Sequence, residues 1–219
     1  MRTLFTAELS ELADDLAAMA RHVATAIGDA GEALLTRNVE LAQRVIAQDQ
    51  ALDELEETVD SRCVLLIAQQ QPVGLDLRTI VVGLRISAGL ERMGDLAQHI
   101  AETARRAYPD SAIPDSHQEL FSQMATAAKK AADEVVQLIV SRDLNVAAGI
   151  VDDDDTLDSL HAQAYQTLLA PGYAGAAPEV LNVSLLARYF ERFGDHAVGI
   201  SRRIVYLVTG DYQREGGQI

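Results

Sequence analysis

The sequence predicts an all-α protein made of two tandem three-helix bundles, six helices in total, related by a pseudo-twofold internal repeat. Three observations lead to this fold class. The composition allows a packed helical core, because 48% of the residues are hydrophobic and only five are prolines. Apolar residues recur at spacings of three and four, which is typical of helices, and no stretch alternates with the period of a strand. The stretch "ERMGDLA" returns as "ERFGDHA", with Glu91 and Glu191 lying 191 − 91 = 100 residues apart.

The first half of the chain accounts for three of these helices. An apolar stripe with helical spacing predicts a first helix that runs to about residue 35; it consists of Leu9, Leu12, Leu16, Met19, Val23 and Ile27. Asn38 is a favourable N-cap for a second helix, which should continue to about residue 70. Pro72 and Gly74 then interrupt the helical pattern, and a third helix is expected over about 76–106.

The second half repeats this plan after the linker "YPDSAIPDS". Helices are expected over about 116–141, from a cap at Asp143 to about residue 169, and, after the break "PGYAGAAP", over about 179–208. The predicted units are therefore residues 1–110 and residues 111–210. Residues 211–219 are expected to form a polar C-terminal tail.

The two halves also match residue by residue. Asn38 and Asp143 occupy equivalent capping positions, 143 − 38 = 105 residues apart. The same offset pairs the acids of "QDQALDEL" with those of "DDDDTLDSL". The offset falls to 100 for the two ERxGDxA stretches, and the change lies in the loops, where length changes are tolerated. Duplication of a three-helix unit explains this pattern better than coincidence does.

Charge and composition exclude several classes of function. The net charge of −15 disfavours direct binding to nucleic acid or to an anionic membrane surface. No stretch approaches the roughly 20 apolar residues of a membrane span, and the acidic N-terminal segment does not resemble a signal peptide. The single cysteine, Cys63, cannot form a disulfide within the chain and is read as a core residue. A cytoplasmic location is therefore expected.

Four carboxylates of the first half are predicted to face one another. Asp49 and Asp53 are four residues apart on one face of the second helix, as Glu91 and Asp95 are on the third. Counted from the turn between these antiparallel helices, Glu91 falls opposite Glu56, and Asp95 falls beside Asp53. The two acidic pairs should therefore lie at the same level.

The second half repeats the arrangement with Asp154 and Asp158 opposite Glu191 and Asp195. Facing carboxylates repel one another unless a cation lies between them. Oxygen ligands suit hard cations such as Mg²⁺, Mn²⁺, Ca²⁺ or iron, and helix bundles commonly hold such sites. The sequence thus favours a metal site in each half, while the alternative is that these acids lie on solvated faces and pair with arginine and lysine.

The neighbouring residues also permit two interpretations. Gly94 and Gly194 each cost a helix about 1 kcal/mol relative to alanine, so either a neighbouring helix or a bound ion should approach closely there. Arg92 and Arg192 could be surface ion-pair partners, or could recruit a phosphate or carboxylate beside a metal. Three histidines are weaker ligand candidates because the repeat does not keep them: His99, His161 and His196.

These motifs resemble those of the PhoU family of phosphate-signalling regulators. The resemblance spans the whole chain, and "ERMGDLA", "ERFGDHA", "DQALD" and "DDTLD" are its most specific marks. It implies metal binding by the eight acids Asp49, Asp53, Glu91, Asp95, Asp154, Asp158, Glu191 and Asp195. The ion, whether Mg²⁺, Mn²⁺, iron or Zn²⁺, cannot be read from the residues.

The resemblance also implies a function without catalysis. A protein of this family is expected to be a cytoplasmic homodimer and an adaptor that represses the phosphate-starvation response. Its expected partners are a sensor histidine kinase and the ATPase of the phosphate ABC transporter. Two alternatives stay open: a carboxylate-bridged di-metal enzyme of the di-iron or ferritin-like kind, and a metal-free helical scaffold. The first is disfavoured because no glutamate has a histidine three residues later.

Overall fold

A computed structural model describes residues 2–211, with side chains from Phe5 onward, and it confirms the all-α fold class. Within this range the chain forms six α-helices and one short 3₁₀ turn, η1, at Asp115–His117. The helices are α1 (Arg2–Thr36), α2 (Val39–Gln70), α3 (Leu75–Ala107), α4 (Gln118–Ser141), α5 (Leu144–Leu168) and α6 (Ala177–Thr209). The polar tail predicted for 211–219 lies, beyond residue 211, outside the described residues.

The helix ends follow from local chemistry. The Asn38 side chain accepts a hydrogen bond from the backbone N–H of Leu41 at 3.0 Å, so it caps α2 as expected. Asp143 caps α5 in the same way, accepting from the N–H of Asn145 at 2.8 Å. The break between α2 and α3 falls at residues 71–74, where Gly74 has a φ of +57°. These helix ends therefore fall where the capping and breaking residues of the sequence predict them.

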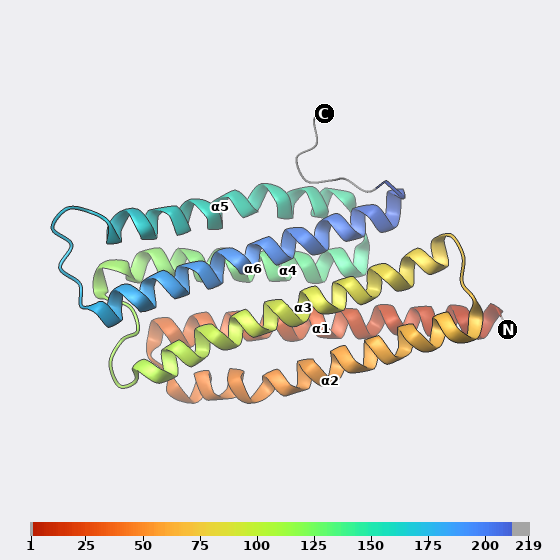
Figure 1. Cartoon of the computed structure of the whole chain (residues 1–219), viewed down its shortest axis with the longest axis horizontal. Coiled ribbons are helices and arrows are strands. Elements are labelled where there is room, and N and C mark those ends of the chain that lie inside the picture. The colour runs from red at the N-terminus through yellow and green to blue at the C-terminus, as the bar shows by residue number, and fades with distance from the viewer. Residues whose placement is uncertain (1, 212–219) are drawn as a thin grey trace.

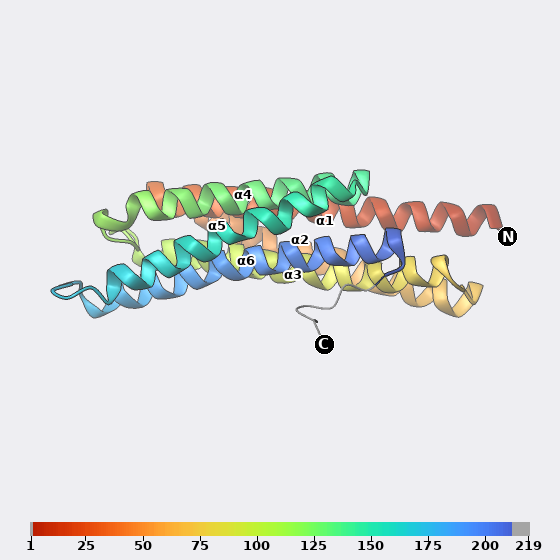
Figure 2. The same ribbon diagram turned by 90° about the horizontal axis from the view of Figure 1, so that it is seen from above.

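The six helices form two three-helix bundles that lie side by side. Figure 1 shows α1, α2 and α3 in one half and α4, α5 and α6 in the other, with α3 and α6 adjacent at the junction. Figure 2 shows α1 and α4 in a second layer behind them. Each bundle thus contributes its first and third helices to the junction, while α2 and α5 lie on the outer flanks.

Small residues bring the two bundles together. A Cβ atom at Gly31 of α1 would lie 2.9 Å from Cβ of Ala125 on α4, which is closer than packed side chains approach. On the other layer, a Cβ at Gly89 of α3 would lie 3.1 Å from Cγ1 of Ile200 on α6. At these two positions a side chain of one bundle therefore packs against the backbone of a glycine in the other, which leaves little room for a larger residue.

The core is continuous across both bundles, with some differences in composition. Phe121, Phe190 and Phe193 are fully buried in the second bundle, and the rings of Phe121 and Phe190 are 6.2 Å apart. The first bundle relies on aliphatic residues such as Leu12 and Ile27. Across residues 2–211, no helix reaches the length and hydropathy that a membrane crossing demands.

Candidate metal centres

The acidic residues predicted from the first half meet in the groove between α2 and α3. Asp53, on the same helix, and Asp95, on the facing helix, both act electrostatically on the carboxyl group of Asp49. Glu91 is acted on by Asp95 and by Glu56, the residue predicted to face it. The structure therefore brings the four predicted acids into one cluster and adds Glu56 to it.

Burial and mutual repulsion keep this cluster from ionising freely. Burial, followed by the charges of Asp53 and Asp95, raises the pKa of Asp49 to about 6. Burial, followed by the charge of Asp95, raises the pKa of Glu91 to about 7. Carboxyl groups with raised pKa values gain most from a cation, because the cation removes the repulsion that holds their protons on.

An arginine partly neutralises the first cluster. Nη1 of Arg92 donates to Oδ2 of Asp95 at 2.8 Å, and its Nε lies 3.3 Å from Oε2 of Glu91. The Arg92 side chain is 60% exposed, so both ion pairs are weak, and the guanidinium can turn into solvent at little cost. Of the two interpretations of Arg92, the structure shows the ion-pair partner.

The second cluster lies between α5 and α6, and more of its buried polar atoms lack a hydrogen-bond partner than in the first cluster. Burial, followed by the charges of Asp158 and Asp195, raises the pKa of Asp154 to about 6. Burial, followed by the charge of Asp195, also raises the pKa of Glu191, which is ion-paired with Arg188. Two of its oxygens are buried without a hydrogen-bond partner, namely Oδ1 of Asp154 and Oε2 of Glu191.

His161 belongs to this cluster, although its position in the repeat made it a weak candidate. Its Nε2 is buried without a hydrogen-bond partner, and its charge acts on Glu191. His161 is the counterpart of Glu56, since 161 − 56 = 105, but the two act with opposite sign: the charge of Glu56 acts to raise the pKa of Glu91, whereas His161 acts to lower the pKa of Glu191. The residue type differs between the repeats, so conservation of type could not identify His161. Its position could have done so, because it occupies the repeat position of Glu56, which the sequence places opposite Glu91.

The two mid-helix glycines are explained by the approach of a neighbouring helix. A Cβ at Gly94 would lie 2.1 Å from Cδ2 of Leu52, which occupies the face of α2 against α3. A Cβ at Gly194 would lie 2.4 Å from Oδ1 of Asp154 and 2.9 Å from Cδ1 of Leu157. The glycines thus let α2 and α5 approach closely enough to bring their carboxylates up to α3 and α6.

The clusters are not metal sites in their present side-chain conformations. Within residues 2–211, no three His, Cys, Asp or Glu side chains converge closely enough to hold a metal ion. The donors nevertheless suit one, because carboxyl groups of the two facing helices interact electrostatically in each cluster and, in the second, two oxygens and a ring nitrogen have no partner. Metal binding by the eight acids therefore stays a prediction, and it requires the carboxylates to rotate toward a common centre.

Comparison with known proteins identifies the family. The PhoU domain matches the chain twice, over residues 16–104 and 121–204. A relative from Mycobacterium tuberculosis, the phosphate-specific transport system accessory protein PhoU homolog 2, is 34% identical over 97% of this chain and 100% of its own length. PhoU homolog 1 of the same species is 36% identical over 96% of this chain and 95% of its own length.

Solved structures show the same architecture. The crystal structure of PhoU from Pseudomonas aeruginosa superposes with a TM-score of 0.86 at 28% identity, covering 94% of this chain and 100% of the other. The phosphate transport system regulatory protein PhoU from Streptococcus pneumoniae has the same fold, with a TM-score of 0.86 at 23% identity over 96% of this chain and 99% of the other. With two matched domains and full-length relatives, the chain belongs to the PhoU family.

Proposed function

We propose that this protein regulates cellular phosphate transport and homeostasis. The observation that supports the proposal most directly is that relatives named as accessory proteins of the phosphate-specific transport system match nearly the whole chain. Both repeats and both acidic clusters lie within the matched length. We therefore propose the regulatory role for the two bundles together and not for one of them alone.

In more detail, the protein would act in the cytoplasm as a negative regulator of the phosphate-starvation response. It would serve as an adaptor between the ATPase of the phosphate ABC transporter and a sensor histidine kinase, as a homodimer and without enzymatic activity. The long helices and the net charge of −15 would offer extended acidic faces to other proteins. Phosphate supply would change the contacts made on these faces.

The acidic clusters would give the adaptor its metal dependence. In the first bundle Asp49, Asp53, Glu91 and Asp95, with Glu56 beside them, would hold an ion through oxygen atoms alone. In the second bundle the corresponding acids and His161 would offer a mixed oxygen and nitrogen set, which suits iron, Mn²⁺ or Zn²⁺ better than Mg²⁺. A bound cation supplies charge neutralisation, and it would join α2 to α3 and α5 to α6.

The regulatory proposal is tested in cells. Deleting the gene should raise the expression of phosphate-uptake genes in phosphate-rich medium and lead to an excess of intracellular phosphate or polyphosphate. Transcripts of these genes and total polyphosphate would be measured in deletion and complemented strains. Unchanged transcripts in a strain without a second PhoU protein would refute the proposal.

The metal proposal is tested on the purified protein. Asp95→Asn combined with Asp195→Asn should lower the bound metal found by elemental analysis and preserve the helical circular dichroism. A ligand that binds only the folded state stabilises it in proportion to ln(1 + [L]/Kd), so Mg²⁺, Mn²⁺ or iron should raise the melting temperature of the wild type more than that of the double variant. Equal shifts would place the ion elsewhere, and oxidase activity of the iron-loaded protein would favour the di-metal enzyme.

A further inference from the structure

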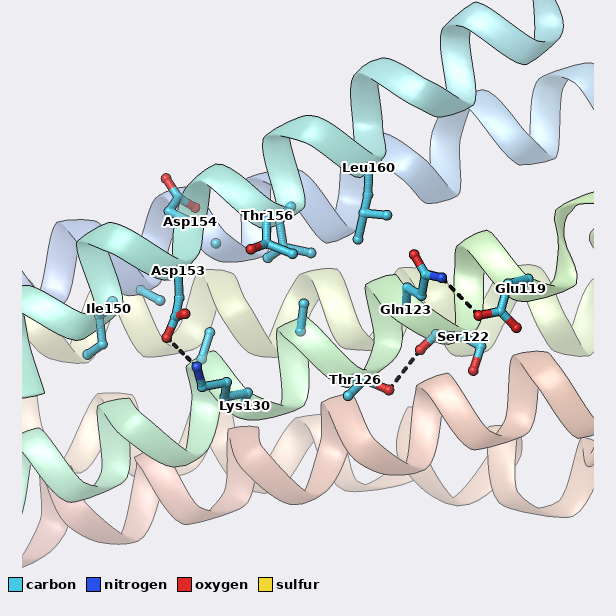
Figure 3. Close-up of a pocket in the computed structure, with 15 residues that line it drawn as sticks. Glu119, Ser122, Gln123, Thr126, Lys130, Ile150, Asp153, Asp154, Thr156 and Leu160 are labelled. Carbon is cyan, nitrogen blue, oxygen red and sulfur yellow. Dashed lines mark hydrogen bonds and ion pairs between the residues drawn. The ribbon is translucent and has the colours of Figure 1, made fainter.

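The second bundle contains a groove that neither metal binding nor phosphate regulation explains. A pocket of about 510 Å³ opens between α4 and α5, and α6 forms its floor (Figure 3). The buried lining is mostly apolar, with Ala131, Ile150, Leu157, Leu160 and Ala197, although Oδ1 of Asp154 is also buried there. Figure 3 shows α5 rising away from α4 toward the Glu119 end, so the groove is elongated along the helices. From Glu119 to Lys130, 11 residues at 1.5 Å each give a length of about 16 Å.

Two polar side chains of the groove wall already make hydrogen bonds within α4. The hydroxyl of Thr126 donates to the backbone carbonyl of Ser122 at 2.9 Å. The side-chain amide of Gln123 donates to Oε1 of Glu119 at 2.8 Å. Both bonds are internal to α4, so a partner that covers these side chains does not break them. The charged carboxylate of Glu119 still needs a partner when it is covered, and a basic side chain can supply one.

The corresponding positions of the first bundle carry larger side chains. Thr126 and Ala127 are the counterparts of Arg21 and His22, since 126 − 21 = 105. His22 is half-buried and its ring lies close to the backbone of Gln48 on α2, so it reaches across from one helix to the other. Ala127 is too short to reach across in this way.

An ion-pair clamp also distinguishes the two bundles. Arg62 of α2 reaches α1, where its Nε donates to Oδ2 of Asp15 at 3.0 Å and its Nη1 pairs with Glu11. The counterpart of Arg62 is Thr167, whose hydroxyl donates to the carbonyl of Gln163 in its own helix at 3.0 Å. The second bundle thus lacks these two contacts, and its first two helices are joined instead by the ion pair of Lys130 on α4 with Asp153 on α5.

The charge of the groove restricts what can occupy it. Of its four ionisable lining residues, three are acidic, Glu119, Asp153 and Asp154. The fourth, Lys130, already pairs with Asp153 at 2.6 Å and with Glu134 at 3.7 Å. An occupant must therefore bring positive charge beside an apolar face, and a second copy of this acidic chain, with a net charge of −15, is a poor match.

We propose that the groove between α4 and α5 binds an amphipathic α-helix of a partner protein, with apolar residues on one face and Arg or Lys at its borders. A helix of about 11 residues matches the 16 Å length, and its side chains at i, i+3, i+4 and i+7 would enter the apolar floor. The partner helix would complete a four-helix arrangement with α4, α5 and α6. The inference rests on the proposed adaptor role, for which it supplies the docking surface.

The first test uses a fluorescein-labelled synthetic helix of about 18 residues, with Leu on one face and Arg at the borders, and a control peptide with Glu in place of Arg. Fluorescence anisotropy with the full chain should show binding of the Arg peptide and at least tenfold weaker binding of the Glu peptide, roughly the effect of 1.4 kcal/mol. No binding of the Arg peptide, or equal binding of both, would overturn the proposal.

Matched variants then locate the binding. T126R combined with A127H transfers the first bundle's side chains to the groove and should weaken binding of the Arg peptide about tenfold or more. The reciprocal variant, R21T with H22A, changes the first bundle and should leave binding at the groove intact. Circular dichroism melts would show that both variants fold. Loss of binding in the reciprocal variant, or none in the groove variant, would place the peptide elsewhere.

The second test identifies the natural occupant. A photo-reactive amino acid placed at Gln123 of the full chain in cells should cross-link to a segment of another protein, which mass spectrometry would identify. A basic amphipathic helix as the cross-linked segment supports the proposal. A segment of a second copy, an acidic or non-amphipathic segment, or no product would overturn it. Failure of the proposed phosphate regulation would appear separately, as unchanged phosphate-uptake transcripts in the deletion strain.

Discussion

Substitution of Gly194 by alanine tests why a glycine stands in the middle of α6. The added methyl group would lie 2.4 Å from Oδ1 of Asp154 and 2.9 Å from Cδ1 of Leu157, both on α5. Leu157 is 2% exposed, so it cannot turn aside without displacing other core atoms. One side-chain rotation does not relieve both contacts, and α5 must therefore shift away from α6.

The expected size of the effect is the difference between two opposing contributions. Alanine is better than glycine in a helix interior by about 1 kcal/mol. Overpacking a well-packed core costs about 1–3 kcal/mol, and the two short contacts place this site in the upper part of that range. The net loss in the free energy of unfolding should be about 1–2 kcal/mol, which lowers the melting temperature of a chain of this size by about 2–8 °C.

Gly149 provides the matched control. It lies within α5, and a Cβ there would meet nothing within 4 Å. Gly149→Ala should therefore raise the melting temperature by about 2–4 °C, because only the helix propensity changes. Both variants would be melted without metal and followed by circular dichroism at the helical band. If Gly194→Ala proves as stable as Gly149→Ala, close packing of α5 is not the reason for the glycine.

Three further predictions concern pH, capping and metal preference. The raised pKa values of Asp49, Glu91 and Asp154, about 6, 7 and 6, mean that the folded state keeps protons that the unfolded chain releases near pH 4. The free energy of unfolding of the metal-free protein should therefore fall as the pH rises from about 4 to 7, and melts in chelator that show rising stability over this range would contradict the prediction. Asn38→Ala should cost about 1 kcal/mol, or about 2–4 °C of melting temperature, because the N–H of Leu41 loses its acceptor; an unchanged melt would show that the cap is dispensable. His161→Glu should make the second cluster resemble the first, so the two sites should bind metals with the same preference in competition titrations, and a persistent difference would exclude His161 as its source.

Much of the fold could be read from the sequence because helix ends depend on neighbouring residues. Asn38, Asp143, Pro72 and Gly74 act through backbone groups within a few residues, and the structure places every helix end close to its expected position. The acidic clusters were also predictable, since the hairpin register between antiparallel helices is fixed by a short turn. Duplication added a second instance of each feature and made the pattern specific.

Tertiary packing decided what depends on partners distant in the sequence. The close approach of Gly94 to Leu52 follows from the rotation of two helices about their axes, which the spacing of residues does not define. His161 belongs to the second cluster because helix packing places it beside Glu191, where its Nε2 is buried without a hydrogen-bond partner. The groove of the second bundle lies where His22 of the first bundle is replaced by the shorter Ala127. Arg62 reaches Asp15 across 62 − 15 = 47 residues, and only the packed helices reveal that its counterpart, Thr167, makes no such contact.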